Sequence, residues 1–180
     1  MREKKVVVGV VVIFLSMLSH TALGEDGVCK KKSGQTICQE GEVDLIKTNG
    51  LLQTNRTKIN KRVTVKGQAV LRNTQMNEMK VFGEAILFDT TVSGKSEVYG
   101  HLNSQKTQFK QPVTVWSNMM HASRSSFTDI IIASEEGGPR VILSDQTTVN
   151  GNIIFKGEEG RVEMMKGSRV LGKIVNGKKL

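Results

Sequence analysis

Short runs of alternating apolar and polar residues recur along most of this 180-residue chain, separated by polar residues and glycine. Val63-Thr64-Val65 and Thr74-Gln75-Met76 are two of these runs. A period of two places successive side chains on opposite faces, which is typical of a β-strand and not of a helix. The pattern therefore predicts an all-β fold built from short strands.

The runs belong to an internal repeat of about 17 residues. Residues 65–71 (VKGQAVL) and 81–87 (VFGEAIL) match closely, and related segments begin at residues 48, 98, 115, 132, 149 and 170. The third position of the eight segments holds Gly50, Gly67, Gly83, Gly100, Ser117, Ser134, Gly151 and Gly172. Nine residues after the first four segment starts stand Thr57, Thr74, Thr90 and Thr107, followed two residues later by Ile59, Met76, Val92 and Phe109.

A repeat of this length, made of short strands and tight corners, predicts a single-stranded parallel β-helix of about eight coils of about 17 residues. Left-handed β-helices keep a strict hexapeptide step, which this chain does not, so a right-handed helix is favoured. The inward positions should stack as two columns. The first holds Val63, Met79, Val113 and Ile130, and the second holds Val65, Val81, Val98, Val115, Ile132, Val149 and Val170.

The period, the V-x-G-x-Φ signature and the length of the repeat region resemble those of bactofilins, the polymer-forming bacterial β-helix scaffolds. The resemblance covers residues 48–175. It implies a structural protein whose β-helix domains stack end to end without nucleotide.

The first 24 residues have the pattern of a secretory signal: a basic start, an apolar run over 6–18 and small residues ending at Gly24. The alternative is an uncleaved membrane anchor, although the run is short for a membrane span. Export predicts a periplasmic or extracellular location in a bacterium. Cys29 and Cys38 flank a Ser-Gly turn, and in an oxidising compartment they should form a disulfide-closed hairpin.

The expected domain order is therefore a signal peptide (1–24), a disulfide hairpin or cap (25–47), a β-helix domain (48–175) and a basic tail (176–180). The second repeat position, predicted to point outward, carries Phe82, Tyr99 and Trp116 in consecutive coils. Rings one coil apart can stack. The column would then stabilise the coils, be covered by the hairpin or another subunit, or bind a glycan or a protein partner; a register error would instead turn it inward.

Catalytic and cofactor motifs are missing from the sequence. Residues 89–96 end like a phosphate-binding loop but begin with Asp89 in place of glycine, so no nucleotide site is expected. His101 and His121 occupy different repeat phases, and Glu84 and Glu97 are candidate catalytic carboxylates only because they are acidic. The threonine ladder favours shared hydroxyl hydrogen bonds over the paired threonine columns of ice-binding solenoids. We expect no enzyme, cofactor or metal site.

The chain has 26 Lys and Arg against 17 Asp and Glu, a net charge of +9. This spread charge favours contact with polyanions, but no specific nucleic-acid motif accompanies it. Three hypotheses follow. The first is an exported, non-catalytic scaffold of the bacterial envelope that self-associates or binds envelope proteins. The second is a surface adhesin using Phe82, Tyr99 and Trp116, and the third, less favoured, is a carbohydrate-active enzyme.

Overall fold

The computed structural model describes residues 28–134 and 137–180, so the predicted signal at 1–24 lies outside the described residues. This part of the chain folds into a parallel β-solenoid of about seven coils, one fewer than the repeat count predicts. The elements in the described part are all strands. In the same part no helix is long and apolar enough to span a membrane.

The N-terminal half has two long strands that bend around the coil, and the C-terminal half has three short strands per coil. The strands are β1 (Cys29–Lys32), β2 (Gln35–Arg72), β3 (Gln75–Phe88), β4 (Thr91–Val92), β5 (Ser96–Tyr99), β6 (Leu102–Gln105), β7 (Gln108–Phe109), β8 (Val113–Val115), β9 (Met119–Ser123), β10 (Ser126–Phe127), β11 (Ile130–Ile132), β12 (Arg140–Ser144), β13 (Thr148–Val149), β14 (Ile153–Phe155), β15 (Gly160–Met164), β16 (Arg169–Val170), β17 (Ile174–Val175) and β18 (Gly177–Lys179).

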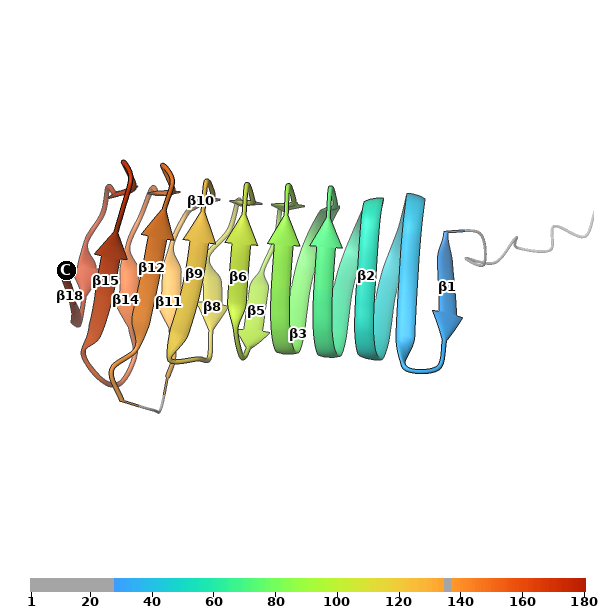
Figure 1. The fold of residues 1–180 in the computed structure, drawn as a ribbon, viewed down its shortest axis with the longest axis horizontal. Coiled ribbons are helices and arrows are strands. Elements are labelled where there is room, and N and C mark those ends of the chain that lie inside the picture. The colour runs from blue at the N-terminus through green and yellow to red at the C-terminus, as the bar shows by residue number, and fades with distance from the viewer. Residues whose placement is uncertain (1–27, 135–136) are drawn as a thin grey trace, which may run out of the picture.

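Apart from β1, the strands pair in parallel with their counterparts in the next coil, as β5 does with β8 and β8 with β11. In Figure 1 the strands nearest the viewer, β6, β9, β12 and β15, run upward, and the paler strands behind run downward. The chain advances to the left in the same view, so the solenoid is right-handed, as predicted. Apolar side chains fill the interior, including Val65, Val81 and Val98, all fully buried.

One corner of the N-terminal coils is built from stacked glycines. Gly50, Gly67, Gly83 and Gly100 have φ angles of 104°, 133°, 134° and 140°. A Cβ on Gly83 would overlap the carbonyl oxygen of Gly67, one coil earlier, and the same holds along the column. Glycine is needed here because it alone combines a positive φ with such close backbone approach.

At a second corner, non-glycine residues adopt the left-handed conformation. Arg56, Asn73, Asp89, Lys106 and Arg124 have φ angles of 48–51°. A buried hydroxyl residue follows each of them, and its side chain donates to a nearby carbonyl. These bonds run from Thr57 to Asn55 (3.2 Å), Thr74 to Arg72 (2.8 Å), Thr90 to Phe88 (2.9 Å), Thr107 to Gln105 (3.1 Å) and Ser125 to Ser123 (2.9 Å). The hydroxyl ladder thus fixes a turn that would otherwise be strained.

The second predicted inner column, which begins at Val65, is right as far as Ile132 and wrong beyond it. Ile132 pairs with Phe155, not with Val149, which lies between Phe127 and Val170 in the neighbouring column. The reason is a longer corner: Ile130 pairs with Ile153, a separation of 23 residues. Adding 17 residues to Ile132 therefore reaches Val149 in β13 instead of Phe155 in β14.

The same slip misplaces two members of the predicted glycine column. Gly151 lies at the corner between β13 and β14, and Gly172 lies at the equivalent corner of the next coil, between β16 and β17. Neither glycine stacks on Gly100. The Gly151 amide donates to the carbonyl of Thr128 (2.6 Å), and the Gly172 amide to that of Gly151 (3.0 Å). Ser117 and Ser134 remain at the glycine corner, which has three residues between β8 and β9 and seven between β11 and β12.

The two ends of the solenoid differ. At the N-terminal end β1 crosses the first coil and pairs antiparallel with β2, with Cys29 opposite Cys38 and a disulfide between them. At the other end β18 pairs in parallel with β15, so residues 177–179 belong to the last coil. The solenoid therefore extends from Gln35, inside the expected hairpin, to Lys179, inside the expected tail.

The glycine corner predicts a large and local stability effect. Gly83→Ala should lower the free energy of unfolding by about 3 kcal/mol or more, because the new Cβ meets backbone on a neighbouring coil. Gly138→Ala is the matched control: its φ is also positive, at 67°, but nothing lies within 4 Å of the added Cβ. It should cost about 1 kcal/mol. Urea denaturation of both variants measures the difference, and equal losses would contradict a steric role for this column.

Candidate functional site: the aromatic column and its neighbours

Phe82, Tyr99 and Trp116 form one column on the outer surface, as the repeat predicts. Phe82 ends the stretch of β3 that pairs with β5, and it lies opposite Tyr99. Phe82 is 38% exposed, and Tyr99 and Trp116 are half-buried. The column therefore faces outward, and a register error is ruled out.

The three rings stack face to face. The ring centroids of Phe82 and Tyr99 are 4.8 Å apart with planes inclined by 15°, and those of Tyr99 and Trp116 are 4.1 Å apart with planes inclined by 5°. Both faces of Tyr99 are consequently covered by its neighbours. A sugar ring packs on an exposed aromatic face, so the column offers a glycan mainly ring edges. The geometry favours stabilisation of the coils.

A charged cluster lies beside these rings. Lys80 contacts Glu97 at 3.1 Å, and Lys95 contacts the same carboxylate at 2.5 Å. The Lys80 ammonium also lies 5.3 Å from the Phe82 ring centroid and 5.1 Å from that of Tyr99, within cation–π range. The hydrogen bond from Lys95, together with that from Lys80, holds the pKa of Glu97 below its ordinary value. Glu97 therefore stays ionised at neutral pH, which does not suit a general acid.

A second outward column continues toward the C-terminal end on this face. Thr114, Ile131 and Ile154 stack in successive coils, with Val175 in the last. Ile131 and Ile154 are half-buried and Val175 is 44% exposed. The face thus changes from aromatic and charged at β3 and β5 to aliphatic at β14 and β17.

The remaining residues singled out in the sequence do not converge on one site. Glu84 accepts a hydrogen bond from Gln68 at 2.6 Å, and His101 lies 3.4 Å from the Ser117 hydroxyl. His121, on β9, lies opposite Asn103 of β6. The threonine ladder is buried, so it cannot present hydroxyls to ice. Within residues 28–134 and 137–180, no group of three or more His, Cys, Asp or Glu is placed to hold a metal ion.

The phosphate-loop-like segment has a different role. Thr91–Val92 is strand β4, and Ser96 begins β5 with its side chain fully buried. A phosphate loop instead joins a strand to a helix, so this segment is part of the coil wall.

Sequence reasoning missed the Lys80–Glu97 pair, although the signal was present. The two residues are 17 apart, which is the coil repeat, so a lysine and a glutamate at that spacing should stack as neighbours. Lys95 lies two residues before Glu97 in the chain, and its contact could not be read from the repeat alone.

Comparison of the chain with protein-family models, with curated proteins and with solved structures gave no match. The fold and its site are therefore interpreted from their own geometry.

The stacking order predicts unequal effects within the aromatic column. Tyr99→Ala removes two ring contacts and should lower the free energy of unfolding by about 1–3 kcal/mol. Phe82→Ala removes one and should cost about half as much. Chemical denaturation of the two variants checks this order, and a larger loss for Phe82→Ala would contradict it.

The Glu97 cluster predicts a pH-dependent contribution to stability. Because the folded-state pKa of Glu97 is lowered, its stabilisation is present at neutral pH and is lost as the pH falls through the folded-state value. Glu97→Gln should be less stable than the wild type by up to about 1 kcal/mol at pH 7, with the gap closing below about pH 4.

The control for this prediction is Glu159→Gln. Glu159 pairs with Lys178 at 3.3 Å, but its side chain is 59% exposed. Thermal denaturation at several pH values should show little change for this variant, whereas a constant gap for Glu97→Gln would argue against ionisation as the cause.

Proposed function

We propose that this protein is an exported, non-catalytic scaffold of the bacterial envelope that assembles through the C-terminal end of its solenoid. The observation that carries the proposal is the difference between the two ends. One end is partly covered by an antiparallel strand that a disulfide ties to the first coil, and the other presents open strand edges with exposed apolar side chains. A bactofilin-like use of the β-helix, as a building block and not as an enzyme, agrees with this arrangement.

The open end consists of β16, β17 and β18, which pair with β13, β14 and β15 on one side only. No described strand lies beyond them, as Figure 1 makes clear. Leu171, Val175 and Leu180 are 62%, 44% and 57% exposed there. Unpaired edges and exposed apolar rungs favour addition of further strands.

A second copy of the chain is the partner that this end fits. Among the described residues, β1 occupies one side of the N-terminal end, so the open C-terminal ends of two copies should meet around a two-fold axis. Strands related by that axis run in opposite directions and can pair in an antiparallel ladder. The product would be a rod of twice the length, with β1 and its disulfide at each outer end.

Electrostatics should tune this association. The last coils carry Arg161, Arg169, Lys173, Lys178 and Lys179, of which Lys178 pairs with Glu159. Two such ends repel at low ionic strength, and salt or a bound polyanion would reduce the repulsion. The charge therefore makes dimerisation depend on ionic strength.

Export is supported by the disulfide, because such bonds persist in oxidising compartments. The predicted signal is consistent with it. The non-catalytic assignment rests on the carboxylates: Glu97 is held by two lysines and Glu84 by Gln68. The adhesin alternative is less well supported, since stacking covers the ring faces that a glycan would use.

The proposal predicts salt-dependent dimerisation of the mature chain. Analytical ultracentrifugation should find monomer at low salt and concentration, and a dimer that grows with protein concentration and with ionic strength. Leu171→Asp should weaken dimerisation at least tenfold, because it places a charge on the apolar contact.

Met119→Asp is the matched control. Met119 lies on β9, on the side of the solenoid, and is 46% exposed, so its replacement should leave the dimer unchanged. A monomer at every salt concentration would overturn the proposal, and so would equal weakening by the two variants.

A further inference from the structure

The N-terminal end of the solenoid contains a cavity of about 610 Å³. Val43, Leu45 and Ile46 of the first coil line it, together with Cys29 and the lysines of β1. It exists because the described N-terminal segment covers only one side of the first coil: β1 pairs with residues 35–38, and the Gln39 amide donates to the Val28 carbonyl (2.9 Å). Its volume lies in the range of small-molecule sites in proteins.

The floor of this cavity is apolar. Val43 and Ile46 belong to the hydrophobic core, and Leu45 beside them is 51% exposed. Elsewhere along the solenoid the next coil covers such side chains, whereas here no described coil lies over them. An alkyl chain entering the cavity would bury this apolar surface.

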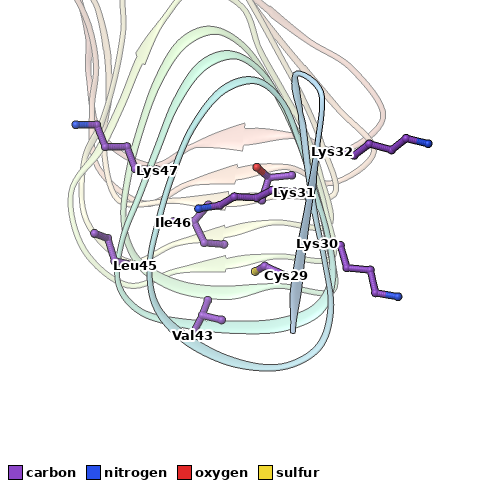
Figure 2. A pocket seen from close by; sticks show the side chains of 9 residues that line it. Cys29, Lys30, Lys31, Lys32, Val43, Leu45, Ile46 and Lys47 are labelled. Carbon is purple, nitrogen blue, oxygen red and sulfur yellow. The ribbon is translucent and has the colours of Figure 1, made fainter. Parts of the chain in front are cut away.

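Among the described residues, the charged ones that line the cavity are lysines: Lys30, Lys31, Lys32 and Lys47. Figure 2 shows Lys31 extending across the mouth toward Ile46, while Lys30 and Lys32 project to the other side of β1. Strand alternation explains the difference, because Lys31 shares its face of β1 with Cys29. Lys31 therefore places its ammonium over the apolar floor.

The two acidic residues on either side of Val43 are paired with lysines other than Lys31. Glu42 and Asp44 pair with Lys58 and Lys61 of the next coil, at 3.1 and 2.8 Å. The described part of the mouth thus combines an apolar floor with one positive charge that crosses it. That combination suits an anionic head group attached to an apolar chain.

From these observations we infer that the N-terminal cavity binds a single-chain carboxylate amphiphile, with its alkyl chain against Val43 and Ile46 and its carboxylate against Lys31. A second solenoid is a poorer occupant, because it would bring its own basic end onto these lysines. This site is separate from the C-terminal end through which the protein is proposed to assemble.

Dodecanoate, below the concentration at which it forms micelles, is the probe. Calorimetric titration of the full mature chain should give saturable binding of one dodecanoate per chain. A neutral dodecyl sugar should bind at least tenfold more weakly because it lacks the carboxylate, and acetate should show no binding because it lacks the chain.

Two lysine variants locate the site. Lys31→Glu should weaken dodecanoate binding at least tenfold, and Lys106→Glu, with the same charge change on an exposed lysine outside the cavity lining, should stay within twofold of the wild type. Circular dichroism and the melting temperature establish that both variants are folded. Reduction of the Cys29–Cys38 disulfide should also weaken binding, because it frees β1.

The results that would overturn the inference are distinct. Equal binding of dodecanoate and the neutral dodecyl sugar would remove the role of the carboxylate. Equal effects of the two lysine variants would remove the role of Lys31, and an absence of dodecanoate binding would remove the site. None of these outcomes depends on whether the chain dimerises through its other end.

Discussion

Parallel pairing of each coil with the next is the constraint on which the rest of this structure depends. Because the backbone ladder fixes both the spacing and the register of successive coils, residues of the same phase lie directly above one another. The residue type at one position therefore restricts which residue types fit at the stacked positions above and below it. Glycines meet glycine carbonyls, buried hydroxyls line a left-handed turn, and aromatic rings stack on rings.

Sequence predicts the N-terminal half well for this reason. The strand register stays close to 17 residues from Val65 to Ile132, so the glycine corner and the Phe82–Tyr99–Trp116 column follow from counting. Beyond Ile132 the corners lengthen, and only the backbone pairing identifies the true partner of each strand. A constant period carries no information about where extra residues enter a coil, which is why Val149 was placed in the wrong column.

The features that sequence could not provide are those set by three-dimensional placement. The contact of Lys95 with Glu97 depends on the direction of the Lys95 side chain, which lies just before β5 begins at Ser96. The cavity at the N-terminal end depends on how far β1 extends over the first coil, whereas the sequence assigns residues 43–47 only to a hairpin or cap. The disulfide was predictable from its hairpin spacing, but its position across the end of the rod was not.

The lengthened corner also has an evolutionary meaning. Between β8 and β9 three residues complete the turn, whereas between β11 and β12 the chain runs from Ile132 to Arg140, and the strands on either side still pair with their neighbours. The length of this corner can therefore change without disturbing the strand pairing between coils. Segments of new sequence can be acquired there without a change of fold, so this rim is where related solenoids would diverge first and where a foreign peptide could be grafted.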